Sequence, residues 1–103
     1  MLKLTAEEKE LLVQLGLRIR KARIARQVTQ EELGVRAGVS RQTIVSMEQG
    51  DPAVGIGKWI KVSSLLGLED TWHSVLELPV DPFEEYDRQL TARDRLRKTR
   101  VRK

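Results

Sequence analysis

Residues 29–50, with the sequence TQEELGVRAGVSRQTIVSMEQG, restrict the possible folds of this chain more than any other segment. Thr29 is followed three positions later by Glu32, which is the pattern of a capping box at the start of a helix. Gly38 is placed to end that helix in a left-handed conformation, and Ser40 is placed to cap the next one. The segment therefore predicts two short helices, over about 30–37 and 41–49, joined by a tight turn.

The two predicted helices each have an apolar and a polar side. Leu33 and Ala37 share one side of the first helix, and Ile44 and Met47 share one side of the second, so we expect these sides to face a core. The residues left on the outside of the second helix are Arg41, Gln42, Thr43 and Ser46. A helix pair with a short turn that contains glycine is the arrangement that places its second helix in a DNA major groove.

The same block resembles the helix-turn-helix of the Cro/cI (XRE) repressor family. The positions that carry the resemblance are Gln30, Leu33, Gly38-Val39-Ser40, Thr43-Ile44 and Glu48-Gln49-Gly50. Gly34 departs from the family pattern, which usually has Ala there, but both residues are small enough for close helix packing. The resemblance covers about residues 10–78 and implies an all-α, five-helix domain.

Three further helices are expected from the spacing of apolar residues. A first helix over about 6–26, opened by a capping box at Thr5, would turn inward Leu11, Leu12, Leu15, Ile19 and Ala22. A fourth over about 56–66 would turn inward Ile56, Trp59, Ile60, Ser63 and Leu66. A fifth over about 68–78 ends before Pro79. We therefore divide the chain into a DNA-binding domain, residues 1–78, and a charged C-terminal extension, residues 79–103, with a helix over about 82–98.

The charge is distributed unevenly along the chain. Residues 1–68 hold 11 Lys/Arg against 7 Asp/Glu, residues 69–87 hold 7 acids and no Lys or Arg, and residues 88–103 hold 8 basic residues against one acid. A basic domain with a helix-turn-helix suits phosphate binding. There is no cysteine, no apolar run approaches the ~18 residues of a membrane span, and the N-terminus lacks the pattern of a signal peptide, so we expect a cytoplasmic location.

The candidate DNA contacts divide into base reading and backbone positioning. Arg41 can bond bidentately to guanine and Gln42 to adenine, and Ser46 lies one turn further along. The N-terminus of the helix that begins at Gln30 can meet a phosphate, and Lys58 is a further candidate for such a contact. The family resemblance also implies phosphate contacts for Gln30, Ser40 and Thr43, and an ion pair between Arg23 and Glu48 that holds the recognition helix and orients Arg23 toward phosphate.

A single recognition helix buries too little surface for tight specific binding. We therefore expect a homodimer on a palindromic double-stranded operator. Its candidate interface is Trp72, Val75 and Leu76, although Trp72 also suits the monomer core. Nothing indicates an enzyme, a cofactor or a metal site. His73 is the only histidine and has no ligand cluster around it, and Gly55–Lys58 lacks the strand and spacing of a phosphate loop.

The extension admits three interpretations: a solvated end, a DNA-backbone contact, or a partner-binding segment anchored by Phe83 and Tyr86. A helix-turn-helix with a short C-terminal arm resembles HipB-like antitoxins, which repress their own operon and bind a HipA-like kinase toxin. The resemblance implies an autoregulatory repressor. The alternatives are a stand-alone XRE-type regulator or a restriction–modification controller, and a toxin-neutralising interaction module with little DNA role.

Overall fold

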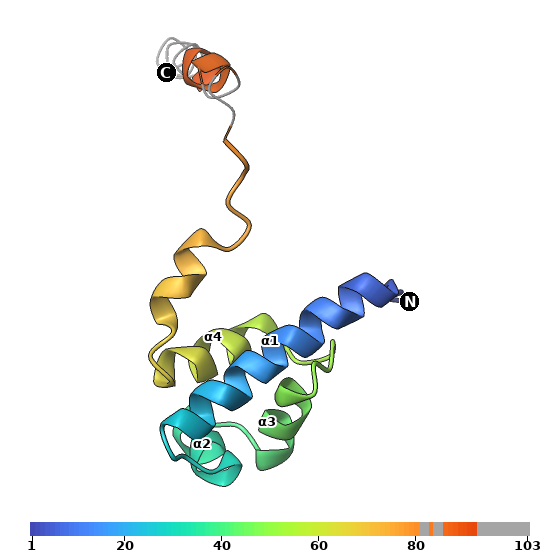
Figure 1. The fold of residues 1–103 in the computed structure, drawn as a ribbon, viewed down its shortest axis with the longest axis vertical. Coiled ribbons are helices and arrows are strands. Elements are labelled where there is room, and N and C mark those ends of the chain that lie inside the picture. Colours follow the sequence, from blue (N-terminus) through green and yellow to red (C-terminus); the bar gives the residue numbers. More distant parts are fainter. Residues whose placement is uncertain (81–82, 84–85, 93–103) are drawn as a thin grey trace, which may run out of the picture.

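The computed structural model describes residues 1–80, 83 and 86–92, and these residues form helices and loops without a strand. Four α-helices precede a short 3-10 helix: α1 (Ala6–Ala25), α2 (Gln30–Ala37), α3 (Arg41–Glu48), α4 (Ile56–Leu65) and η1 (Glu69–Ser74) (Figure 1). The predicted all-α, five-helix architecture is thus confirmed. Residues 83 and 86–92 are helical as expected, while the remaining positions of the predicted tail helix lie outside the described residues.

The helix ends lie where the sequence places caps. At the start of α1, Thr5 and Glu8 form a complete capping box. The Thr5 backbone nitrogen donates to Glu8 Oε1 at 2.8 Å, and the Glu8 backbone nitrogen donates to Thr5 Oγ1 at 3.1 Å. Thr29 caps α2 by accepting from the Glu32 amide at 3.0 Å. The Glu32 carboxylate, however, accepts from the Thr29 hydroxyl and not from its backbone N–H, so this predicted box is only half formed. Gly38 ends α2 with a φ of 74°, the left-handed conformation expected there.

The core gathers one side chain or more from each of the four α-helices. Its buried members are Ile19, Leu33, Ile44, Met47, Trp59, Val62 and Leu66. Ala37, Val39 and Trp72 are partly buried and pack against this cluster. The inward positions predicted for α2 and α3 are therefore correct, and α3 is held to the domain by two side chains with no exposed surface, Ile44 and Met47.

Helix α1 crosses the end of α3 at a point that has no room for a side chain. A Cβ added to Gly16 would lie 2.5 Å from the Glu48 carbonyl oxygen and 2.6 Å from that of Met47. The backbones of α1 and α3 therefore meet directly. This crossing fixes the position of α3 relative to α1, and the spacing of apolar residues in the sequence does not indicate its glycine.

The predicted inward faces of α1 and α4 are partly wrong. Leu11 is exposed because the N-terminal turns of α1 extend past the other helices (Figure 1), and Leu15 is exposed at an open hollow that it lines together with residues of α4 and η1. Ile56 is 66 % exposed in the first turn of α4, and Ile60 is exposed because it lies about 100° around the helix from Trp59. Val62 fills the position on the core side that Ile60 was expected to occupy.

The fifth helix is shorter and tighter than predicted. The segment over 68–78 was expected to be one α-helix. It forms the 3-10 helix η1 and then a turn in which Leu76 has a φ of 61°. The hydroxyl groups of Thr71 and Ser74 donate to the carbonyl oxygens of Leu68 and Thr71, at 2.6 and 3.3 Å. Such side-chain bonds compete with the α-helical pattern, and most residues of this segment, EDTWHS, favour the helix weakly.

Candidate nucleic-acid interface

The start of α3 combines a firm cap with two exposed polar side chains. The Ser40 hydroxyl accepts from the Thr43 amide at 3.1 Å, and the Ser40 and Thr43 hydroxyls bond to each other at 2.9 Å. Arg41 and Gln42, the two residues that follow the cap, are exposed. Because Ile44 and Met47 hold the opposite side of α3 in the core, the exposed side presents Arg41 and Gln42 outward from a rigid element.

A buried ion pair ties this helix to α1. The Arg23 Nε donates to Glu48 Oε2 at 2.7 Å and the terminal nitrogen Nη2 donates to Oε1 at 3.2 Å. The two side chains are 13 % and 5 % exposed. The remaining guanidinium nitrogen of Arg23 donates to the Val28 carbonyl oxygen at 2.9 Å. The ion pair expected from the resemblance is therefore present, and it spans the end of α1, the loop after it and the end of α3.

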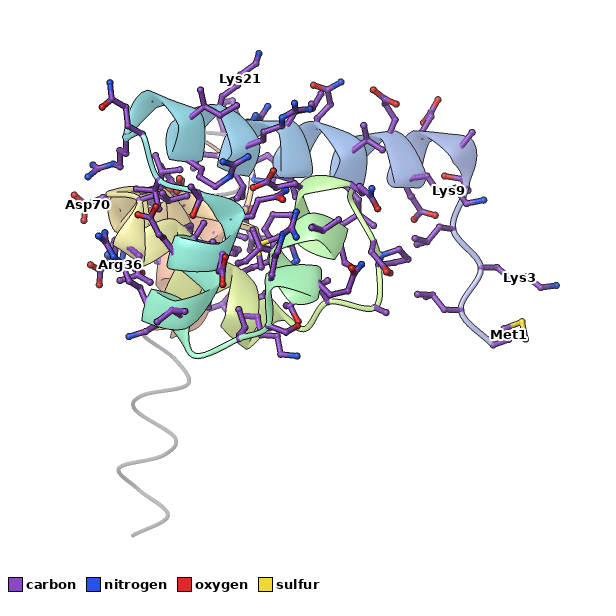
Figure 2. All side chains as sticks on the ribbon, turned by 90° about the horizontal axis from the view of Figure 1, so that it is seen from below. Met1, Lys3, Lys9, Lys21, Arg36 and Asp70 are labelled. Atoms are coloured by element: carbon purple, nitrogen blue, oxygen red, sulfur yellow. The ribbon has the colours of Figure 1, made fainter. Side chains whose placement is uncertain are left out.

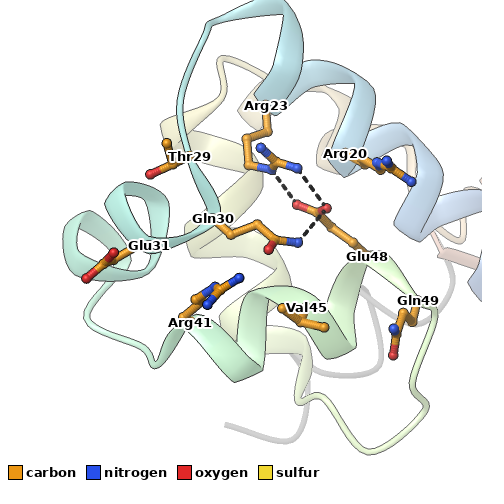
Figure 3. Close-up of a pocket in the computed structure, with 9 residues that line it drawn as sticks. All are labelled: Arg20, Arg23, Thr29, Gln30, Glu31, Arg41, Val45, Glu48 and Gln49. Carbon is orange, nitrogen blue, oxygen red and sulfur yellow. Dashed lines mark hydrogen bonds and ion pairs between the residues drawn. The ribbon is translucent and has the colours of Figure 1, made fainter.

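Gln30 joins the same network. Its side-chain amide donates to Glu48 Oε1 at 3.2 Å, so that carboxylate receives bonds from both α1 and α2 (Figure 3). Helices α1 and α2 thus both donate to the one carboxylate at the end of α3, and no buried side-chain polar atom is left without a partner in the described part of the chain. The phosphate contact expected for Gln30 stays a prediction.

An open hollow lies between these three helices. It is lined by Arg20, Arg23, Thr29, Gln30, Glu31, Arg41, Val45, Glu48 and Gln49 (Figure 3). Glu48 neutralises Arg23, but the guanidinium groups of Arg20 and Arg41 make no ion pair or hydrogen bond within the described residues. The hollow therefore presents two available cations beside the N-terminus of α2, an arrangement that attracts phosphate.

The hollow brings together only some of the residues predicted to contact DNA. Arg23, Gln30 and Arg41 line it, while Ser40, Gln42, Thr43 and Ser46 lie along α3 without lining it. The Gln42 amide is 3.5 Å from the Ser46 hydroxyl, which places these two on one side of α3. Lys58 is exposed on α4 and does not line the hollow. Arg20 also lines the hollow, and its position three residues before Arg23 indicates the same side of α1.

The other predicted contacts lie away from the hollow. Trp72 is partly buried, and its indole nitrogen donates to the Ser63 hydroxyl at 2.6 Å. Val75 and Leu76 are exposed, as are Phe83 and Tyr86 in the extension. The side chains across the described surface, including Lys21 and Arg36, are drawn in Figure 2. The basic residues from Arg93 to the end lie outside the described residues.

Comparison with known proteins agrees with this geometry. The HTH_3 family model, described as helix-turn-helix, matches residues 19–73, more than half of the 103-residue chain, and the chain belongs to this family of Cro/cI (XRE)-type DNA-binding domains. No curated protein matches the chain. Membership associates the domain with DNA binding and transcription regulation, and the family is typically non-catalytic.

Neither a membrane-spanning helix nor a metal-ligand cluster occurs in the residues that the structure describes. Among these residues, none of the helices is both long and apolar enough to cross a bilayer. No cluster of three or more His, Cys, Asp or Glu side chains suited to a metal ion occurs in the same residues.

Proposed function

We propose that the chain is a dimeric transcriptional repressor that binds a palindromic operator. The observation that carries the proposal is the pair of exposed side chains, Arg41 and Gln42, at the start of a capped helix whose other side is buried. In a major groove, Arg41 would bond to guanine O6 and N7, and Gln42 to adenine N6 and N7. Repression would be steric, because the bound dimer covers DNA that the polymerase needs.

The positioning contacts would surround this pair. Arg23, Gln30, Ser40, Thr43, Ser46 and Lys58 are the proposed phosphate contacts, with Ser46 also able to reach a base edge. Arg20 joins them on the strength of its place in the hollow beside Arg41. The Arg23–Glu48 bond keeps the Arg23 guanidinium fixed, so any phosphate contact by Arg23 would use a group already oriented by the fold.

The test begins with a selection of bound sequences from a random DNA pool at a stated salt concentration. Operator and random-DNA affinities are then measured for the wild type, for Arg41→Ala/Gln42→Ala, and for a control that removes the same two groups elsewhere, Arg36→Ala/Gln14→Ala. Each bidentate base contact is worth ~1–3 kcal/mol. The first variant should therefore lose at least about 30-fold in operator preference, and the control should keep it. Unchanged preference in the first variant contradicts the proposal.

A narrower proposal concerns the extension. Phe83 and Tyr86 are 83 % and 62 % exposed, and large exposed aromatic side chains are typical anchors of protein interfaces. We propose that they contact a HipA-like kinase toxin and that the chain is the autoregulatory antitoxin of that operon. A kinase-like gene beside this one, whose product co-purifies with the full chain but not after Phe83→Ala/Tyr86→Ala, would support this role.

Failure of that co-purification with operator binding intact would leave a stand-alone XRE-type regulator or a restriction–modification controller. The reverse result, a stable toxin complex with no operator preference in the wild type, would favour the interaction module. The two measurements therefore separate the alternatives without depending on each other.

A further inference from the structure

A second hollow lies on the side of α1 that faces away from the DNA contacts. This groove is formed by α1, α4 and η1, and its lining includes Leu15, Ile19, Ala22, Trp59, Trp72 and Val75. The polar side chains at its rim include Arg18 and Lys21, which are exposed on α1. The groove shares no lining residue with the hollow that contains Arg20 and Arg41. An occupant of the groove would therefore leave the proposed DNA contacts open.

An apolar segment follows the groove in the sequence and is not covered by the domain. Leu76, Leu78 and Val80 alternate with Glu77 and Pro79, and these three apolar side chains are 92 %, 67 % and 69 % exposed. Single exposed apolar residues are ordinary. Three within five residues, in a chain that also has an open apolar groove, are the kind of exposed apolar surface that marks an interaction site.

The groove and the segment carry opposite charges. The rim of the groove carries the basic side chains of Arg18 and Lys21, whereas residues 76–80 carry one acid, Glu77, between two exposed leucines, and no Lys or Arg. A basic rim around an apolar floor fits an acidic, apolar peptide. The segment therefore matches the groove in polarity as well as in charge.

The segment does not fill the groove of its own chain. Val75 lies at the edge of the groove, and the chain turns at Leu76, which has a φ of 61°. Figure 1 shows the residues after η1 leading away from the helices. A left-handed leucine costs about 1 kcal/mol or more, and one that is this exposed has little packing to hold it. Residues 77–80 therefore project from the domain, where the groove of a second copy can receive them.

We propose that residues 76–80 of one copy dock in the α1–α4–η1 groove of a second copy, with the reciprocal contact on the other side of a two-fold axis. Such an exchange forms two equivalent contacts, because each copy supplies one segment and one groove. Each contact buries the apolar side chains of one segment in the apolar groove of the other copy. This inference rests on the proposed function, since it specifies how the operator-binding dimer forms. It also gives Trp72, Val75 and Leu76 their place in the interface, as groove wall, groove edge and first docked residue.

The first experiment measures the dimer dissociation constant of the full chain by analytical ultracentrifugation. Leu78→Glu places a charge on the docking segment, and Ile56→Glu is its control, because Ile56 is 66 % exposed and does not line the groove. Neither side chain belongs to the buried core. Leu78→Glu should raise the dissociation constant at least about tenfold, from the loss of a buried leucine, and Ile56→Glu should leave it within about twofold. A dimer unaffected by Leu78→Glu overturns the inference.

The second experiment asks which chain supplies the segment. The protein contains no cysteine, so Ala22→Cys/Leu78→Cys introduces one thiol in the groove and one on the segment. Oxidation should give a covalent dimer on a non-reducing gel, whereas Ile56→Cys/Leu78→Cys should give much less. A cross-link within one chain would show the segment folding back onto its own groove, and the exchange would be wrong.

Operator binding tests the proposed repressor function separately from the proposed segment exchange. If Leu78→Glu is monomeric but still prefers operator over random DNA at high protein concentration, the exchange and the DNA-reading role both stand. If the wild type is a dimer but Ala22→Cys/Leu78→Cys forms no cross-link between copies, the exchange fails while the repressor proposal stands. If the wild type shows no operator preference, the proposed function fails whatever the cross-linking shows.

Discussion

Arg23 connects three parts of the domain: α1, the loop that follows it and the end of α3. It bonds to Glu48 at the end of α3 and to the Val28 carbonyl after α1, and its partner Glu48 also receives the Gln30 amide. Removing Arg23 leaves a carboxylate that is 5 % exposed without its cation. Breaking a buried pair in this way typically costs about 3–5 kcal/mol. We therefore expect Arg23→Ala to lower the free energy of unfolding by an amount in this range, as measured by urea denaturation.

The matched control for that change is Arg20→Ala. Arg20 lies three residues earlier on α1, lines the same hollow and makes no ion pair in the described residues. Its removal should change the free energy of unfolding by no more than about 0.5 kcal/mol. If Arg23→Ala were as stable as Arg20→Ala but bound DNA less well, the role of Arg23 would be contact with DNA and not support of α3.

At the scale of the helix pair, the α1–α3 crossing depends on the absence of a side chain at Gly16. Alanine would improve helix propensity by up to ~1 kcal/mol, but its Cβ would lie 2.5–2.8 Å from the backbone of Met47 and Glu48. Neither backbone can give way without moving a helix. We expect a net loss of about 1–3 kcal/mol in the free energy of unfolding for Gly16→Ala.

Gly57→Ala provides the comparison for Gly16→Ala. A Cβ at Gly57 in α4 meets nothing within 4 Å, so only the propensity gain applies and the protein should become more stable by up to ~1 kcal/mol. Thermal unfolding followed by circular dichroism measures both variants. Two substitutions of the same kind should thus change the melting temperature in opposite directions, and equal effects would contradict the close crossing.

The bounds of α1 to α3 could be predicted from the sequence because their start and stop signals are local. Thr5, Thr29, Ser40 and Gly38 act on neighbouring backbone groups, and each does so in the structure. The exposed sides of helices were harder to predict, because burial depends on what covers a residue. Ile56 continues the apolar stripe of α4 but lies where no other element reaches it.

The residues of the candidate site also divide into those whose position the local sequence predicts and those whose position depends on the packing of the helices. The Ser40 cap sets where α3 begins, and therefore which positions Arg41 and Gln42 occupy in it. Their exposure follows because Ile44 and Met47 hold the other side of α3 in the core. The Gln30–Glu48 bond and the shared hollow of Arg20 and Arg41 join residues 18 to 21 positions apart. Their proximity depends on the angle between helices, which the backbone contact at Gly16 helps to set, and no local pattern records that angle.

At the scale of the whole molecule, the two hollows place different chemistry on different sides of α1. One side presents Arg20 and the recognition helix, and the other presents the apolar groove. A repressor needs both kinds of surface at once, because the dimer contact must remain while DNA is bound. The acidic stretch over residues 69–87 lies in the sequence between a basic domain and a basic end, and its own negative charge disfavours contact with phosphate.

Electrostatic attraction to phosphate should make DNA binding depend steeply on salt, and Arg20 offers a direct test of this dependence. Each neutralised phosphate adds about −0.9 to the slope of log K against log salt concentration. If Arg20 neutralises one phosphate, Arg20→Ala should weaken operator and random DNA binding alike and make the slope shallower by about 1. Arg36→Ala, which removes an exposed charge outside the hollow, should leave the slope nearly unchanged. Identical slopes for both variants would place Arg20 away from the phosphate backbone.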